Sequence, residues 1–94
     1  MPYLLIRHKV EDYTKWKPFF DEHGTTRKSE GSKGGYVFRN ADDRNEIVML
    51  FEVEDLERIR RFIESEDLRE AMQKSGVTDK PDIYYLEEAD RPSA

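Results

Sequence analysis

The sequence predicts one small α+β domain, with a four-stranded antiparallel sheet that carries its helices on one face. Two runs, residues 3–10 and 46–53, are apolar on both sides, which is typical of central strands covered on both faces. Residues 12–29 and 55–74 instead repeat apolar residues at helical spacing. Together with two shorter strand-like runs, these segments predict the order βαββααβ.

The first strand is expected at Tyr3–Val10, with its polar residues gathered at its end. A helix follows, and either Asp12 or Thr14 is a suitable N-cap. Pro18 lies within this helix and cannot donate a backbone hydrogen bond, so we expect the helix to be distorted before it.

The helix is expected to continue through Gly24 to about Ser29, although an interior glycine costs roughly 1 kcal/mol. Ending it at Gly24 would leave an unusually long loop. Gly31–Gly35 is expected to be a plain loop, and its glycines lack the spacing of a phosphate-binding loop. Tyr36–Arg39 is the second expected strand, and Asn40–Asn45 has the composition of a hairpin turn.

Glu46–Val53 is the strongest strand pattern in the chain. A helix is expected at Asp55–Ile63, and a second helical piece at Leu68–Lys74. Asp67 and Glu70 resemble a capping box for that piece.

The last strand is expected at Asp82–Glu87, within a single domain of residues 1–88 and before a frayed tail of residues 89–94. The element order is the ferredoxin-like split βαβ pattern.

A ferredoxin-like sheet has one face without helices, and here both central strands are apolar on that face as well. Leucine, isoleucine, valine and phenylalanine are only about 22% of the residues, close to the level of disordered chains. A core this small gains from burying a second surface, and exposed apolar patches of several hundred Å² are rare in monomers. We therefore expect a homodimer through the sheet face, related by two-fold symmetry.

The composition excludes several classes of function. The net charge of −5 disfavours nucleic acid, which requires a positive surface. The absence of cysteine excludes disulfides and thiol catalysis. The first residues have the pattern of neither a signal peptide nor a membrane span, so we expect a cytoplasmic protein with no membrane partner.

Three stretches carry a resemblance to a known family: "RHKVEDYTKWKPFFDEH", "GGYVFRNADDRNEIVMLFEVEDLE" and "SEDLREAMQKSGVTDKPDIYYLEE". With the element order, they resemble the dimeric α/β-barrel superfamily, and most closely the small proteins related to antibiotic-biosynthesis monooxygenases, some of which are labelled cyclases. This superfamily also includes haem-degrading oxygenases and isomerases. The resemblance therefore implies a fold more firmly than an activity.

Haem chemistry does not carry over from these relatives. Haem-degrading members use an asparagine on the first strand and a tryptophan and a histidine in the second helical region. Here the first strand ends with Arg7 and His8, and residues 56–76 contain neither tryptophan nor histidine. Cofactor-independent members need mainly an apolar pocket for an oxidisable, phenol-like substrate, so we expect no cofactor.

The stretch "WKPFFDEHGTTR" contains the candidate site. At helical spacing, Trp16, Phe20, His23 and Arg27 fall within roughly 60° of one another. Tyr13 flanks them. One interpretation is a core helix whose polar end satisfies backbone groups. The other is that the aromatic residues wall a cavity for an aromatic ligand, that His23 accepts a proton and that Arg27 holds an oxyanion.

Two further candidates lie on strands. His8 shares the apolar face of its strand and is either a catalytic base or a histidine hydrogen-bonded at a strand end. Phe51 is a candidate substrate-binding residue on the strongest strand. Glu52 is expected either to pair with Arg7 or to lie at the exposed end of its strand. Two histidines without a paired spacing do not indicate a metal site.

Two functions follow from these candidates. The first is a small-molecule enzyme, a cofactor-independent monooxygenase or cyclase acting on an aromatic or polyketide-like compound. The second is a non-catalytic ligand-binding or structural homodimer. A cavity beside His8 or His23 distinguishes the two, because an enzyme needs that space and a structural dimer can fill it.

Overall fold

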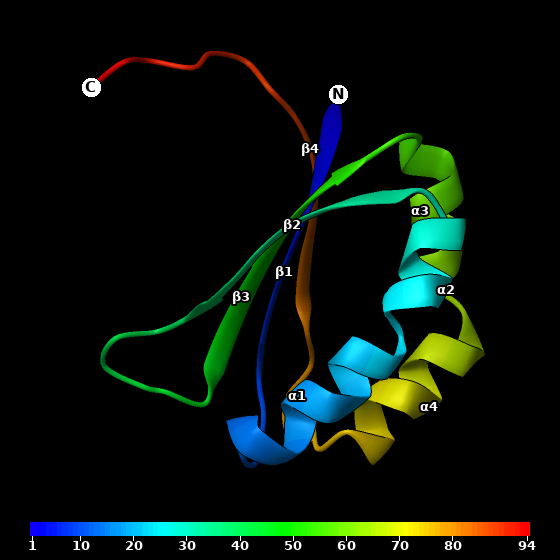
Figure 1. Cartoon of the computed structure of the whole chain (residues 1–94), viewed down its shortest axis with the longest axis vertical. Coiled ribbons are helices and arrows are strands. Elements are labelled where there is room, and N and C mark those ends of the chain that lie inside the picture. Colours follow the sequence, from blue (N-terminus) through cyan, green and yellow to red (C-terminus); the bar gives the residue numbers. More distant parts are fainter.

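The computed structural model describes all residues, 1–94, as one sheet with helices packed on one face (Figure 1). The elements, in chain order, are β1 (Pro2–Lys9), α1 (Tyr13–Glu22), α2 (Gly24–Ser29), β2 (Ser32–Arg39), β3 (Glu46–Val53), α3 (Leu56–Ile63), α4 (Glu66–Lys74) and β4 (Asp82–Glu87).

The sheet has the strand order β2-β3-β1-β4, and all neighbouring strands are antiparallel. Central β1 pairs with β3 on one side, placing Leu5 opposite Leu50, and with β4 on the other, placing Ile6 opposite Ile83. This arrangement confirms the predicted ferredoxin-like α+β class with a four-stranded antiparallel sheet.

Strand alternation divides the apolar residues of β1 and β3 between the two faces of the sheet. On the helix-covered face the core consists of Leu4, Ile6, Val10, Trp16, Ile47, Met49, Phe51, Val53 and Ile59. The opposite face carries large side chains that remain exposed, namely Tyr36, Phe38, Tyr84 and Leu86. We call this second surface the open face.

Helix α1 begins where the sequence indicated, with Asp12 as its N-cap. The Asp12 carboxylate accepts hydrogen bonds from the Thr14 backbone N–H at 2.9 Å and from the Thr14 hydroxyl at 2.7 Å. Pro18 lies inside a helix that begins at Tyr13, so the interruption does not precede the proline as expected.

The interruption lies instead at His23, and the prediction of one helix continuing to Ser29 was wrong. His23 has φ −82° and ψ 0°, and α2 begins at Gly24. A glycine is a weak helix former, so little free energy opposes a break beside it. Across this break, the Arg27 guanidinium lies over the Phe20 ring.

The prediction of a loop at Gly31–Gly35 was also wrong, because β2 already begins at Ser32. Ser32 lies opposite Val53 and Gly35 opposite Phe51, with a bulge between them. At Gly35 the two strands approach so closely that a Cβ atom would lie 1.9 Å from the Leu50 carbonyl oxygen. The glycine therefore permits strand pairing here.

The cap of α4 also differs from the prediction. The predicted capping box at Asp67 and Glu70 is not the start of this helix, which begins at Glu66. The Ser65 hydroxyl caps it instead, accepting a hydrogen bond from the Leu68 N–H at 3.3 Å.

Arg7 on the open face pairs with residues other than Glu52. Its guanidinium contacts Glu46 at 3.0 Å, Asp79 at 2.7 Å and Asp82 at 2.9 Å. Arg7 is thus paired with these three carboxylates, whereas Glu52 lies farther along β3, opposite Tyr3.

Residues 88–94 form no helix or strand and extend away from the sheet (Figure 1). None of the helices is long and apolar enough to cross a membrane.

Candidate functional site

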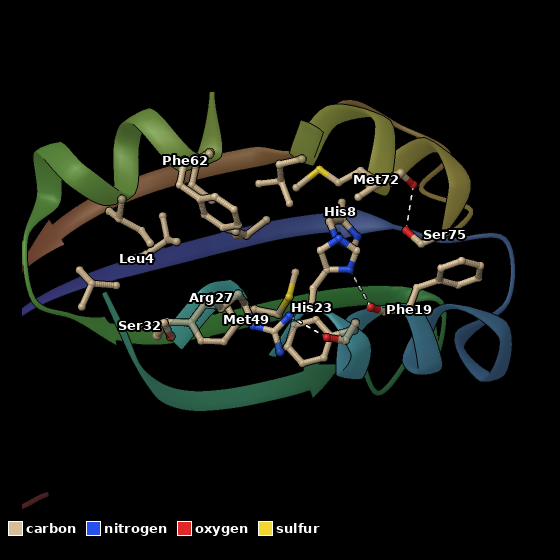
Figure 2. Close-up of a pocket in the computed structure, with 18 of the residues that line it drawn as sticks. Leu4, His8, Phe19, His23, Arg27, Ser32, Met49, Phe62, Met72 and Ser75 are labelled. Atoms are coloured by element: carbon tan, nitrogen blue, oxygen red, sulfur yellow. Dashed lines mark hydrogen bonds between the residues drawn. The ribbon is translucent and has the colours of Figure 1, made fainter. Parts of the chain in front are cut away.

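A cavity lies between the covered face of the sheet and the helices (Figure 2). Its volume is about 70 Å³, room for a few water molecules and well below the roughly 300–1,000 Å³ of typical ligand pockets. The lining residues are Leu4, Ile6, His8, Trp16, Phe19, Phe20, His23, Arg27, Ser32, Met49, Phe51, Val53, Ile59, Phe62, Ile63, Leu68, Ala71, Met72 and Ser75. Most are apolar, and the polar exceptions include both histidines of the chain.

An aromatic stack forms one wall of the cavity. The rings of Trp16 and Phe20 lie 4.9 Å apart, and those of Phe20 and Phe51 lie 6.1 Å apart. The structure thus brings together three of the four predicted ligand-binding residues. Tyr13 packs against Trp16 at 5.8 Å but does not line the cavity.

His8 reaches this cavity because alternation along β1 places it on the same face as Leu4 and Ile6. Its side chain is only 1% exposed, and its Nδ1 atom is buried without a hydrogen-bond partner. The ring meets Trp16 edge-on at 5.7 Å. No protein group therefore hydrogen-bonds Nδ1 of His8.

Burial is the main influence on the ionisation of His8. Removing the imidazolium from water lowers the pKa of His8 below its usual 6.5, and the nearby charge of Asp79 opposes this only partly. The ring is therefore neutral at pH 7, with one nitrogen that can donate a hydrogen bond and one that can accept.

His23 lies at the break between α1 and α2, which turns its ring toward the end of α1. Its Nδ1 is 3.1 Å from the Phe19 carbonyl oxygen. A carbonyl only accepts hydrogen bonds, so Nδ1 carries the hydrogen in this contact, and the Nε2 of the neutral ring is left as an acceptor. The side chain is half-buried at the edge of the cavity.

Arg27 of α2 folds back over the aromatic stack. Its guanidinium carbon lies 3.7 Å from the centre of the Phe20 ring, and Nη1 donates a 2.7 Å hydrogen bond to the Phe20 carbonyl. No carboxylate lies within ion-pairing distance of it. Burial lowers the pKa of Arg27, only partly offset by the charge of Asp21, and the group remains charged.

Sequence reasoning missed the opposite wall, which α3 and α4 provide (Figure 2). Four of its residues follow the spacing i, i+3, i+4, i+7, and this pattern could have identified them: Leu68, Ala71, Met72 and Ser75. The polar residues between them obscured the pattern. No residue of α4 is buried, so α4 is a weakly packed part of this wall.

Metal ligands do not converge anywhere in the chain. No group of three or more histidine, aspartate or glutamate side chains is placed to hold an ion. The polar side chains that line the cavity are two imidazoles, one guanidinium and the hydroxyls of Ser32 and Ser75.

Comparison with solved structures shows a shared fold at low sequence identity. An antibiotic biosynthesis monooxygenase superposes with a TM-score of 0.71 at 10% identity, covering 96% of this chain and 100% of its own. SnoaB, a cofactor-independent oxygenase from Streptomyces nogalater, gives 0.68 at 13% identity and 94% coverage of both chains. The chain has the antibiotic biosynthesis monooxygenase fold. This confirms the dimeric α/β-barrel resemblance at the level of fold.

The same fold also occurs in a conserved protein from Methanosarcina mazei Go1, with a TM-score of 0.61 at 15% identity, covering 94% of this chain and 92% of the other. No protein-family model and no curated protein matches the sequence. At this degree of identity the likeness describes the fold, so any activity must be argued from the cavity itself.

Proposed function

We propose that the cavity binds a small aromatic, phenol-like molecule and that the chain is an enzyme of the cofactor-independent monooxygenase or cyclase type. The unpartnered nitrogen of His8 carries this proposal. A buried polar atom without a partner costs about 1–3 kcal/mol. Native structures rarely keep such an atom without a role, and a ligand hydroxyl in the cavity would supply the missing partner.

The cavity groups suit proton removal from a phenol. The free Nε2 of His23 accepts the proton, and the Arg27 guanidinium stabilises the resulting oxyanion. His8, neutral and inside the apolar wall, hydrogen-bonds a hydroxyl of the substrate and fixes its orientation. Removal of water from this space strengthens all three interactions.

Such an anion can reduce oxygen without a cofactor. A ring CH₂ group reacts with O₂ to give a ring ketone and water, so that one oxygen atom enters the product and the other leaves as water. The substrate supplies the electrons, and the proton taken by His23 is returned to the departing water. The protein's part is to bind, orient and deprotonate the substrate.

The small volume of the cavity requires an opening movement. A polycyclic phenol is larger than the present space of about 70 Å³, so the α4 wall must move outward on binding. None of its residues is buried, which lowers the cost of this movement.

The small volume also favours the second candidate, a non-catalytic homodimer whose interior is filled by its own side chains. In that case neither an aromatic ligand nor oxygen uptake would depend on the two histidines.

Oxygen uptake distinguishes these functions. A polycyclic phenol with a ring CH₂ group should consume one O₂ per ketone formed, measured with an oxygen electrode and by absorbance. His23→Asn should slow this reaction by about 10²–10⁴-fold, the usual contribution of a general base. Glu22→Gln, an isosteric change at the exposed neighbouring residue, should leave the rate unchanged. An equal rate in His23→Asn, or no reaction over the uncatalysed background, would remove the enzyme proposal.

We also propose that two copies associate through the open face. Tyr36 and Phe38 stack there at 5.5 Å while 62% and 50% exposed, and Tyr84 and Leu86 extend the apolar surface across the sheet. Burying this surface against a second sheet removes it from water. Light scattering should give about twice the chain mass of 11.2 kDa. The mass of a single chain would contradict the dimer.

A further inference from the structure

A second hollow adjoins the cavity and opens to solvent. It is a groove of about 580 Å³ between α2 and β2. Phe20, Arg27, Ser32 and Phe51 line both spaces. Arg27, stacked on Phe20, therefore stands at the boundary between the apolar cavity and the open groove.

The groove is positively charged although the whole chain is acidic. Arg27, Lys28 and Lys33 line it, and Glu54 is the single carboxylate in its lining. That carboxylate already has partners, because Lys33 contacts it at 2.6 Å and Arg58 at 3.9 Å. Arg27 and Lys28 therefore have no carboxylate partner in the groove, although the protein has a net charge of −5.

Of these two cations, Arg27 is the stronger indication of a ligand, because Arg27 is half-buried and Lys28 is exposed. A desolvated cation normally acquires an anionic partner, since burying an unpaired charge is unfavourable. Arg27 has only the Phe20 carbonyl, which engages Nη1 and leaves Nε and Nη2 free. Stacking on Phe20 holds the flat face of the guanidinium and leaves its hydrogen-bonding edge available for a ligand.

We propose that the groove binds the carboxylate of a hydroxylated aromatic acid, with Arg27 and Lys28 holding the carboxylate while the aromatic ring enters the cavity beside Phe20. This deepens the proposed function, on which it rests, by naming the class of ligand. The free Nε and Nη2 edge of Arg27 can hold the carboxylate, and the charge of Arg27 also acts on a ring oxyanion next to that carboxylate. Once the α4 wall moves outward, the apolar cavity just beyond Phe20 can receive a flat ring carried by the same molecule.

A calorimetric titration with three ligands tests this assignment. The first is 1-hydroxy-2-naphthoate; the second is 1-naphthol, the same ring system without the carboxylate; the third is inorganic phosphate, an anion without a ring. A hydrogen bond to a charged group is worth enough to change affinity by about tenfold or more. The acid should therefore bind wild-type protein at least about tenfold more tightly than 1-naphthol, and phosphate should bind more weakly than the acid.

Arg27→Gln should abolish the preference for the acid, so that the acid and 1-naphthol bind the variant with similar affinity. Arg60→Gln is the matched control, because Arg60 stacks on Tyr85 at 4.1 Å and lines neither hollow. It should retain the full preference. Lys28→Gln, at an exposed position that does not support the fold, should reduce the preference only about twofold.

Each outcome decides the assignment. Equal binding of the acid and 1-naphthol by wild-type protein overturns the carboxylate site but leaves the aromatic cavity intact. Failure of both ring compounds to bind overturns the cavity as well. Phosphate binding as tight as the acid, lost in Arg27→Gln, replaces the aromatic acid with a simple anion. If Arg27→Gln does not fold, two other measurements decide. The proposal is overturned if Lys28→Gln keeps the full preference for the acid over 1-naphthol and if the affinity of wild-type protein for the acid depends on salt no more than its affinity for 1-naphthol does.

Discussion

At the scale of single residues, His8 is the most unusual feature of the molecule. Its position on the helix-covered face could be predicted from alternation along the first strand. Its unpartnered Nδ1 could not, because the absence of a partner depends on every element packed around it. The same holds for Arg27, whose side of the helix was predicted but whose lack of a carboxylate partner appears only after folding.

Replacing His8 with phenylalanine should stabilise the protein at pH 7 and impair ligand binding. The substitution removes a buried, unpaired polar atom and keeps a ring against Trp16, so we expect the free energy of unfolding to rise by about 1 kcal/mol. Urea denaturation followed by Trp16 fluorescence measures this change. An equally large loss of stability would mean that the imidazole is bonded in the fold.

The pH dependence of stability should also change in His8→Phe. Because burial lowers the pKa of His8 in the folded state, the unfolded chain binds a proton more readily below about pH 6.5. The stability of the wild type is therefore complete above pH 6.5 and falls as the pH decreases toward the folded-state pKa, by up to about 1.4 kcal/mol per pH unit. The difference between wild type and variant should shrink above pH 6.5 and grow below it. A difference independent of pH would contradict a neutral, buried His8.

At the scale of elements, the sequence was most informative where apolar residues lie on both faces of a strand. β1 and β3 were predicted within a residue or so of their bounds because apolar residues on both faces of a short run are typical of a central strand. The start of β2 was missed because Ser32, Gly34 and Gly35 have the composition of a turn. Their strand pairing depends on β3, which lies elsewhere in the sequence.

Gly35 and Gly24 should respond in opposite ways to substitution by alanine. In Gly35→Ala the new Cβ meets the Leu50 carbonyl oxygen at 1.9 Å, so β2 and β3 must separate, and we expect a loss of about 2–3 kcal/mol of unfolding free energy. In Gly24→Ala the nearest contact is ordinary, 3.6 Å from Arg27 Nη2, and a helical alanine should add about 0.4–1 kcal/mol. Thermal unfolding by circular dichroism compares them. A Gly35→Ala protein as stable as Gly24→Ala would show that the strands are not paired this closely.

At the scale of the whole molecule, the cavity belongs to no single element. β1 supplies His8, the α1–α2 junction supplies His23 and Arg27, and α4 closes the space with residues that the sequence did not distinguish. The aromatic stripe predicted from helical spacing identified one wall, because helical periodicity is a local property. The residues of the opposite wall also follow helical spacing in α4, but the part of the sheet that they cover depends on how α4 packs, which the local pattern does not specify.

The open face leads to the last prediction, that stability depends on protein concentration. If two chains unfold from a dimer, dilution favours the unfolded state by mass action, and each tenfold dilution should lower the melting temperature by about 4 °C for two chains of this length. Phe38→Lys places a charge in the centre of the stacked aromatic pair and should give a monomer whose melting temperature is independent of concentration. Thr25→Lys adds the same charge at an exposed position of α2, away from the open face, and should keep the dimer. A melting temperature that does not change with concentration in the wild type would mean that the open face stays uncovered.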